Sequence, residues 1–335
     1  MPTSRALKVC PDLILLPHTS GLYGTMSRSM FDLCETLTPT VQRNSIDEGY
    51  LDLTMCGFKS VPEIEQRLRA LQQRIWDELK IPTSFGIAAN KLVSAIASKA
   101  RKPRGFTMVL PGTEEAFLAP LKISVIPGVG KKTELTLETA GITRVSDLFS
   151  RSEAELKALF GSAWMQLLAM ARGEDDSPVA TEHEDAKSYS TQETFGEDIR
   201  DFAEIERIAK RMIDELMPKI REDGKRVKTM TVKIRYPGME DSSTGHSLTE
   251  ATDLEAPFYP LVTSLLKAVW TKPRPLRLVS VRFSSVDEKG SQLEMFGQTD
   301  DKKRRLAAVL DKLNERGKKS IVQHGHQLNR QGEES

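Results

Sequence analysis

The sequence predicts an α+β protein with several domains. Its 335 residues are enough for two or three domains at roughly 100–200 residues each, and 39% of them are hydrophobic, which allows every domain its own core. Residues 1–173 carry mostly helical patterns, residues 174–186 are acidic with almost no bulky apolar side chain, and residues 187–287 give the order βαββαβ. These observations indicate a helix-rich first part, a linker and a second domain built on a sheet.

The first part alternates helices and strands before it becomes wholly helical. Apolar spacing predicts helices over 22–38, 62–79 and 91–100, and the patterns between them predict strands over 41–55 and 84–90. Pro62 suits the first turn of its helix, and Lys102-Pro103 ends the third helix. Residues 112–172 contain short helices separated by IPGVG and AGIT, and they require no strand.

The second domain has the split βαβ pattern. Strands are predicted over 188–195, 226–236, 246–254 and 276–286, and helices over about 201–220 and 259–269. A tail over 288–335 follows, in which the segment QLEMFG precedes a charged helix expected over about 302–315.

Composition excludes several classes of protein. The 48 Lys+Arg and 47 Asp+Glu leave a formal charge of +1, and no stretch approaches the ~18–20 uninterrupted apolar residues of a membrane-spanning helix. The start has neither a long apolar region nor a cleavage site, so we expect a cytoplasmic protein without a membrane partner. Cys10, Cys34 and Cys56 are widely spaced without a CxxC, so we expect core thiols and neither disulfides nor zinc.

Charge is divided into zones along the chain. Residues 86–105 and 267–282 each hold five basic residues and no acid, whereas residues 174–185 hold six acids and no Lys or Arg. A single charge run is usually a solvated face. Because patches rather than totals decide where a polyanion binds, two basic blocks favour a DNA or RNA groove.

Asp47 and Glu48 form an acidic pair on the strand expected over 41–55. Neighbouring side chains on a strand point to opposite faces, so the pair would not share an ion. If the backbone bends, or if the ion lies beyond the end of the strand, two carboxylates can converge on divalent metals. Both interpretations remain open from these residues alone.

Residues 126–133, IPGVGKKT, combine Gly128 and Gly130 with Lys131 and Lys132 at the start of a helix. In a helix-hairpin-helix the glycines allow a tight turn, and amides at the start of the second helix can face a DNA phosphate. The alternative is an ordinary helix cap. No third Gly follows three residues on, so this is not the dinucleotide fingerprint.

The strand RVKTMTVKIRY alternates basic and apolar residues. Its apolar side chains would face a core, while Lys228, Lys233 and Arg235 would extend from the sheet toward phosphates or toward solvent. The pattern fits a nucleic-acid surface and a solvated outer face equally well.

Taken together, these motifs resemble one family. SIDEGYLDLT, GIAANK, the KPRG turn, FLAPLKISVIPGVGKKT and LVSVRFSSV occur in the order and spacing of Y-family translesion DNA polymerases, similar to bacterial DNA polymerase IV. The resemblance extends over essentially the whole chain. It implies a nucleotidyltransferase that copies damaged DNA with two magnesium ions, in DNA repair, as a nucleoid-associated monomer.

The resemblance also implies the domains. They are a partial polymerase palm over 1–111, an all-helical thumb with a helix-hairpin-helix over 112–173, a linker over 174–186, a little finger over 187–287 and a tail over 288–335. The implied partners are primer-template DNA, a deoxynucleoside triphosphate and the sliding clamp.

Site residues follow from the resemblance position by position. Asp47 and Glu48 match the second and third metal-binding carboxylates of the family, and Lys102 matches its triphosphate-binding lysine. The DNA contacts expected in thumb and little finger are Gly128, Gly130, Lys131, Lys132, Lys228, Lys233, Arg235, Arg277 and Arg282.

The segment QLEMFG resembles the bacterial clamp-binding motif. Gln292 would hydrogen-bond to the clamp, and Leu293, Met295 and Phe296 are apolar residues in a polar stretch. The alternative is that Leu293 and Phe296 pack the following helix onto the little finger.

The sequence departs from the family at its start. Residues 1–6, MPTSRA, resemble a segment that in the family follows the first palm strand and the fingers. That strand supplies the first metal ligand, so we expect a destabilised palm with two of three ligands. We therefore expect the chain to extend a primed template more weakly than a version with a family-type N-terminus.

Two other functions remain as alternatives. One is a non-catalytic polymerase-like accessory protein that binds DNA and the sliding clamp within a mutagenesis complex; such relatives usually lack the acidic residues, which Asp47 and Glu48 represent here. The other is a generic helix-hairpin-helix binding module, which SIDEGYLDLT disfavours.

Overall fold

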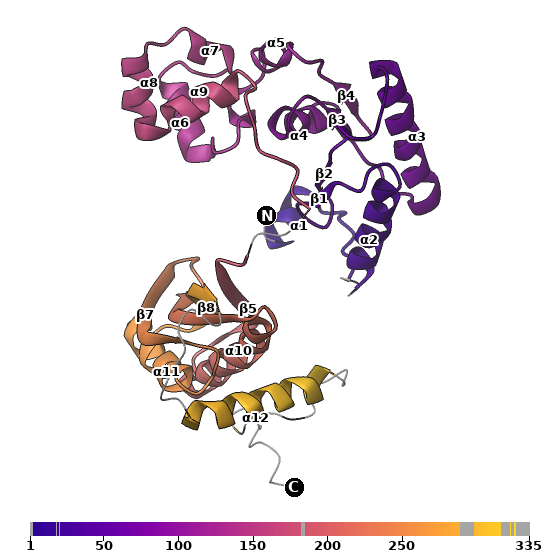
Figure 1. Ribbon diagram of the computed structural model, residues 1–335. Helices are drawn as coiled ribbons and strands as arrows, with labels where there is room; N and C mark the ends of the chain where they lie inside the picture. Colours follow the sequence, from indigo (N-terminus) through magenta and orange to yellow (C-terminus); the bar gives the residue numbers. More distant parts are fainter. Residues whose placement is uncertain are drawn as a thin grey trace. The chain divides into compact units, whose positions relative to one another are not determined.

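The computed structural model of the chain describes residues 3–17, 19, 21–181, 185–288, 298–315, 322 and 325. The chain divides into two compact units, Met1–His183 and Glu184–Ser335 (Figure 1). The boundary lies within the acidic segment that the sequence predicts as a linker.

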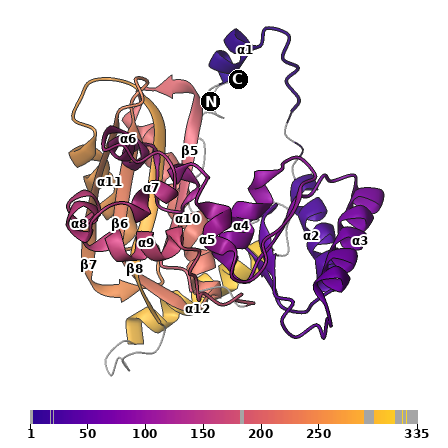
Figure 2. The same cartoon turned by 90° about the horizontal axis from the view of Figure 1, so that it is seen from above.

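The first unit begins with helices that support a small hairpin. Its elements are α1 (Thr3–Val9), α2 (Leu22–Glu35), β1 (Val41–Arg43), β2 (Gly49–Leu51) and α3 (Val61–Leu79). Figure 2 shows α2 and α3 side by side. Phe31 of α2 and Ile75 of α3 are buried in the core that they share with Val41.

The single strand expected over 41–55 is wrong. The chain forms two strands of three residues each, paired antiparallel with Val41 opposite Leu51 and Arg43 opposite Gly49. Apolar residues alternate only over Leu51, Leu53 and Met55, whereas residues 42–48 hold one apolar residue, Ile46, and include the turn where the chain reverses. Gly49 is required because a Cβ there would lie 2.6 Å from the Phe31 ring.

A second, parallel pair of strands lies around α4. β3 (Phe85–Ile87) pairs with β4 (Phe106–Met108), and α4 (Lys91–Ala100) connects them. The strand β4 was not predicted from the sequence. Gly86 lies so close to α4 that a Cβ would meet the Ser94 carbonyl oxygen at 2.0 Å, so only glycine fits there.

Residues 112–172 are helical, as predicted, with one isolated bridge between Lys122 and Arg144. The elements are α5 (Glu114–Leu118), the 3-10 turn η1 (Ile123–Val125), α6 (Lys131–Thr139), α7 (Ser146–Phe149), α8 (Glu153–Phe160), the 3-10 turn η2 (Gly161–Ala163) and α9 (Trp164–Ala171). Leu118, Leu137 and Leu148 are fully buried with Val93 of α4, so these helices share one core with α4.

The second unit has the predicted order βαββαβ. It consists of β5 (Ser188–Ile199), α10 (Phe202–Glu222), β6 (Lys225–Arg235), β7 (Asp241–Thr252), α11 (Phe258–Val269) and β8 (Leu276–Glu288). The strands form an antiparallel sheet in the order β5-β8-β6-β7. Figure 1 shows α10 and α11 on one face of this sheet, and the buried apolar residues lie between the sheet and these helices.

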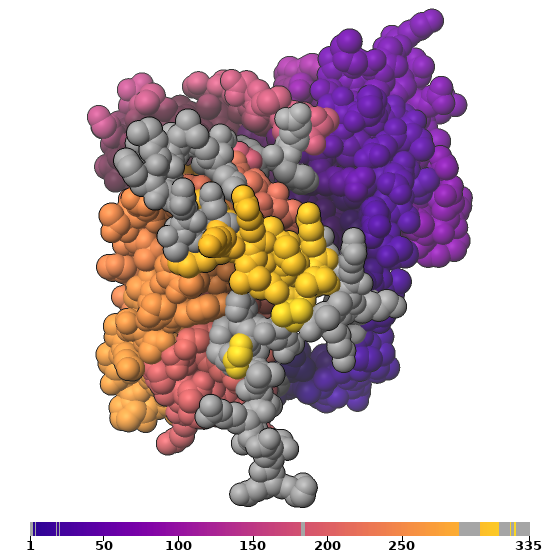
Figure 3. All heavy atoms as spheres, turned by 60° about the horizontal axis from the view of Figure 1, so that its bottom comes forward, coloured from indigo at the N-terminus to yellow at the C-terminus, as the bar shows by residue number. Residues whose placement is uncertain are grey.

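The helix α12 (Gln298–Glu315) begins before the predicted 302 and packs on the second unit. Arg221 of α10 donates to both carboxylate oxygens of Asp311, at 2.7 and 2.9 Å, and Arg304 donates to Asp253 at 3.1 Å. Figure 3 shows α12 on the surface of the molecule. Paired charges and the buried Ala307 therefore attach this helix.

The three cysteines differ in environment, which corrects the expectation of three core thiols. Cys34 is buried, Cys56 is half-buried and Cys10 is exposed. Burial, followed by the charge of Glu35, raises the pKa of the Cys34 thiol to about 11.

These environments predict selective alkylation. At pH 8 iodoacetamide should modify Cys10 and leave Cys34 unmodified, because only the thiolate reacts and Cys34 is both buried and protonated. Peptide mass spectrometry after timed labelling measures this, with labelling in denaturant as the control that exposes every thiol. Equal rates at Cys10 and Cys34 in the folded protein would contradict the structure.

Candidate functional site

The acidic pair lies in the turn of the β1–β2 hairpin, which we call the acidic turn (residues 44–48). The Ser45 hydroxyl donates to Asp47 Oδ1 at 2.6 Å and accepts the amides of Asp47 at 3.2 Å and Glu48 at 3.0 Å. The Asn44 and Ser45 amides donate to the Glu48 carbonyl at 2.9 and 3.0 Å. This corrects the expectation of neighbours on a strand, because the turn removes the alternation that would send the carboxylates to opposite faces.

The acidic turn has the donor type that suits magnesium. Asp47 and Glu48 are exposed, and neither forms an ion pair within the part of the chain that the structure describes. Magnesium in enzymes that handle phosphates is commonly bound by one or two carboxylates, with phosphate oxygens and water completing the shell. Two adjacent carboxylates therefore fit, although no group of three or more His, Cys, Asp or Glu side chains that could hold a metal occurs among the described residues.

Lys91 lies beside the hairpin, and in the sequence it is one of the five basic residues of the run 86–105. Its Nζ is 5.1 Å from the centroid of the Tyr50 ring and donates to Gln42 Oε1 at 2.8 Å. Burial, followed by the charges of Glu48 and Asp175, raises the pKa of Tyr50. Gln42 and Tyr50 are cross-strand partners, so Lys91 contacts both strands of the hairpin.

Lys102 is exposed in the turn between α4 and β4. In the same turn the Arg104 guanidinium lies 4.5 Å from the centroid of the Trp76 ring on α3. No hydrogen bond or ion pair joins Lys102 to Asp47 or Glu48 within the described residues. The structure therefore places these predicted site residues in one unit but does not bring them into contact.

Gly128 and Gly130 form a tight turn before α6. Gly128 has φ +88°, which favours glycine, and the Gly130 amide donates to the Gly128 carbonyl at 3.1 Å. The Glu134 amide donates to the Gly130 carbonyl at 2.8 Å, so the amides of residues 131–133 belong to the first turn, which an α-helix leaves without backbone acceptors. Lys131 and Lys132 are exposed beside these amides.

Polar residues cover the sheet face of the second unit that α10 and α11 leave open. The strand register aligns Ser190, Arg282 and Thr231 in one row, and Gln192, Ser280 and Lys233 in the next. Lys233 donates to Gln192 at 3.3 Å. The apolar residues that alternate with them, such as Val232 and Val281, are fully buried on the helix side.

The five basic residues predicted here differ in how far the protein neutralises them. Arg235 donates to both oxygens of Asp241, at 2.5 and 2.8 Å, and Arg277 donates to Asp198 at 3.2 Å and to the Gly196 carbonyl at 3.3 Å. Lys228, Lys233 and Arg282 form no ion pair with any residue that the structure describes. The charges of these last three side chains are therefore not neutralised by an ion pair among the described residues.

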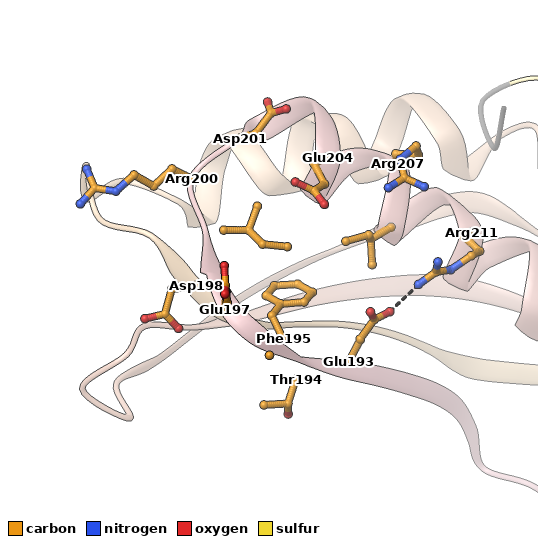
Figure 4. A pocket seen from close by; sticks show the side chains of 13 residues that line it. Glu193, Thr194, Phe195, Glu197, Asp198, Arg200, Asp201, Glu204, Arg207 and Arg211 are labelled. Atoms are coloured by element: carbon orange, nitrogen blue, oxygen red, sulfur yellow. Dashed lines mark hydrogen bonds and ion pairs between the residues drawn. The ribbon is translucent and has the colours of Figure 1, made fainter. Parts of the chain in front are cut away.

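A cavity of about 570 Å³ lies between the end of β5 and the start of α10 (Figure 4). Five carboxylates and three guanidinium groups line it, and Figure 4 marks the ion pair between Arg211 and Glu193. An excess of carboxylates repels phosphate groups. The cavity is therefore not suited to a nucleic acid or a triphosphate, and the candidate site consists of exposed surfaces.

Two further predictions concern the motif QLEMFG and the absence of a membrane-spanning helix. The motif residues Gln292, Leu293, Met295 and Phe296 lie outside the described residues. Among the described residues, no helix is both long and apolar enough to cross a membrane.

Comparison with protein families gives two matches. The family described as impB/mucB/samB matches residues 1–99, and the impB/mucB/samB family C-terminal domain matches residues 186–295.

Comparison with individual proteins gives the same result over a longer span. A protein from Opitutus terrae named DNA polymerase IV is 67% identical over 329 residues, which cover 98% of this chain and 84% of that protein. A DNA polymerase IV from Oceanobacillus iheyensis is 31% identical, over 96% of this chain and 77% of its own. Among solved structures, the Y-family DNA polymerase chimera Dbh-Dpo4(243-245)-Dbh is similar with a TM-score of 0.75 and 26% identity, over 86% of this chain and 83% of that chain.

Proposed function

The chain belongs to the Y-family of DNA polymerases, and we propose that it acts in translesion synthesis as a DNA-directed DNA polymerase of the polymerase IV kind. The observation that carries this proposal is the acidic turn. It presents two carboxylates without ion-pair partners among the described residues, in a chain 67% identical to a relative named DNA polymerase IV. The second unit supports it with a basic, polar sheet face of the kind that contacts a phosphate backbone.

In the proposed mechanism Asp47 and Glu48 would hold magnesium. When bound there, magnesium would lower the charge repulsion between the primer 3′-oxygen and the triphosphate and would stabilise the leaving pyrophosphate. The Ser45 hydroxyl donates to the Asp47 carboxylate and thereby fixes it. The same hydroxyl accepts the amides of Asp47 and Glu48 and thereby fixes the backbone of the turn. Lys102 would place its ammonium group against the triphosphate, since it is exposed and carries no partner that limits its reach among the described residues.

The domains are part of this proposal. Residues 1–111 act as a palm, residues 112–173 as a thumb whose Gly128–Gly130 turn and following amides hold a DNA phosphate, and residues 187–287 as a little finger. Residues 174–186 connect the last two, and the tail over 288–335 follows. The helical part over 112–173 would hold the DNA backbone, while the sheet of residues 187–287 would follow a groove.

Asp47→Ala and Glu48→Ala should each reduce magnesium-dependent primer extension by at least about 100-fold, because removal of a metal carboxylate removes charge stabilisation in the transition state. Single-turnover nucleotide addition with enzyme in excess over primer-template measures the rate. The DNA dissociation constant should change less than about twofold, since these carboxylates act on the metal rather than on phosphates.

The matched control is Asp77→Ala, which removes an exposed carboxylate from α3. It should leave the rate unchanged. Extension that survives loss of both acidic residues would overturn the metal role and would favour a non-catalytic accessory protein that binds DNA.

The open sheet face should bind primer-template DNA through Lys228, Lys233 and Arg282. Changing all three to Gln should weaken binding and reduce the salt dependence of log K by roughly 0.9 for each phosphate contact that is lost on duplex DNA. Arg235→Gln and Arg277→Gln should have smaller effects, because Asp241 and Asp198 already neutralise these side chains. Fluorescence anisotropy at several salt concentrations measures the slopes.

The control for this surface is Lys219→Gln, which removes one exposed charge from α10. This helix lies on the other side of the sheet. A triple variant whose salt dependence equals that of the wild type would exclude the open face as the DNA surface.

We also propose that Gln292, Leu293, Met295 and Phe296 bind the sliding clamp, on the basis of their order in the sequence. Changing Gln292, Leu293 and Phe296 to Ala should abolish binding of purified clamp, because a few apolar anchors usually supply most of the energy of such interfaces. Calorimetric titration measures the affinity, with thermal unfolding run in parallel. Unchanged clamp affinity, or a loss that only accompanies unfolding, would leave the packing role for these residues.

A further inference from the structure

The start of the predicted linker is bound to the first unit. The Asn90 side-chain amide donates to the Gly173 carbonyl at 2.6 Å, and the Leu92 amide donates to Asp175 Oδ2 at 2.9 Å. Lys91 Nζ donates to the Pro178 carbonyl at 3.0 Å. We call these contacts, together with those of Gln42 described below, the linker clasp, and they hold the first residues of the linker against the first unit although most of these residues are exposed.

Asp175 completes the N-terminus of α4 from outside the helix. Asn90 is the N-cap of α4 and accepts the Val93 amide at 3.0 Å, while Asp175 accepts the Leu92 amide that this cap leaves available. Although burial raises it, hydrogen bonds from Ser177 and Leu92 and the charge of Lys91 hold the pKa of Asp175 below its usual range. An ionised carboxylate is stabilised at this position by the helix dipole.

Gln42 connects the clasp to the hairpin. Its Oε1 accepts both from Lys91 Nζ at 2.8 Å and from the Ala180 amide at 3.0 Å. Gln42 belongs to β1 and pairs with Tyr50 of β2, against whose ring Lys91 lies. One amide oxygen therefore joins the linker, the start of α4 and the hairpin that ends in the acidic turn.

The far end of the linker is also anchored. Asp185 accepts a hydrogen bond from Lys225 Nζ at 2.6 Å, at a site where Lys225 is 8% exposed. Between Ala180 and Asp185 lie four residues, 181–184, rather than the thirteen of the predicted linker 174–186. The length of chain between the anchored ends is therefore much shorter than composition indicates.

We propose that Lys91, Gln42 and Asp175 are positioning residues, which hold the hairpin and thereby the Asp47 and Glu48 carboxylates in the geometry that synthesis requires. The inference rests on the proposed polymerase function for its catalytic consequence. Small displacements of a catalytic group can cost up to about 100-fold in rate. The clasp contacts both three-residue strands of the hairpin, so its loss should change the rate rather than the DNA affinity.

The test uses the full chain with two clasp variants, one control and one conservative variant. Lys91→Met keeps the apolar stem and removes the donor, and Asp175→Ala removes the cap from the linker side. Asp176→Ala changes the adjacent carboxylate, which is exposed, and is the matched control. Lys91→Arg retains a donor and should restore most of what Lys91→Met loses.

Hydrogen–deuterium exchange reads the clasp directly, without any substrate. In both clasp variants, exchange in peptides covering residues 41–51 and 174–181 should become about fivefold faster, as expected for a lost hydrogen bond of ordinary strength. Exchange over residues 225–235 of the second unit should stay the same. Asp176→Ala should match the wild type throughout.

Single-turnover primer extension then reads the consequence. The maximal rate should fall about tenfold or more in Lys91→Met and Asp175→Ala, with DNA affinity within about twofold of the wild type. The magnesium concentration for half-maximal rate should rise in the same variants. The measurement is made at a temperature at which thermal unfolding shows every variant folded, so a loss of global stability would not cause this rise.

Each outcome decides the proposal. Unchanged exchange over residues 41–51 in Lys91→Met and Asp175→Ala overturns the clasp, whatever the enzyme does. Faster exchange with an unchanged rate and magnesium dependence overturns the positioning role. A wild-type chain that adds no nucleotide refutes the proposed function, while the exchange experiment still decides whether the clasp holds the hairpin.

Discussion

The first unit depends on holding a very short hairpin in place. Two strands of three residues are at best marginally stable by themselves in water, and the turn between them carries two adjacent carboxylates whose like charges repel each other. Three supports offset these costs. Phe31 packs beneath Gly49, Ser45 binds the Asp47 carboxylate and two amides, and the clasp contacts Gln42 from the other side. All three supports act on residues 42–49, and together they hold the acidic turn.

Local patterns predicted the elements whose own residues determine them. The helix expected over 62–79 is α3 (Val61–Leu79), because Leu68, Leu71 and Ile75 repeat at helical spacing and Ser60 caps its start. The βαββαβ order also follows, since each strand buries one face and the periodicity changes cleanly between two and 3.6 residues. The hairpin was not predicted, because its strands are only three residues long and its turn is formed by hydrogen bonds of Ser45 rather than by a glycine within residues 44–48.

The sequence predicts which residue types form the site, but it does not predict which of their charges are neutralised by ion pairs. The sequence identifies Lys228, Lys233, Arg235, Arg277 and Arg282 as basic residues near strands. Whether each charge remains available depends on acids that lie elsewhere in the chain. Arg277 is neutralised by Asp198, 79 residues away, whereas Arg282 has no ion-pair partner in the described part of the chain. Such pairs arise from strand register, which no local pattern encodes.

The linker also could be predicted only in part, because its composition does not show the hydrogen bonds that it forms. Its acids, its proline and its lack of bulky apolar residues correctly indicate a segment without a core of its own. Composition does not indicate whether the backbone finds hydrogen-bond partners, and here Gly173, Pro178 and Ala180 find theirs on α4 and β1 through side chains of Asn90, Lys91 and Gln42. A polar side chain can hydrogen-bond to the backbone of another segment without burying apolar area. A hydrophilic segment can therefore still be held in one conformation. Asp175 has both properties. Its charge belongs to the acidic pattern that indicates an exposed segment, and its carboxylate accepts the Leu92 amide at the start of α4.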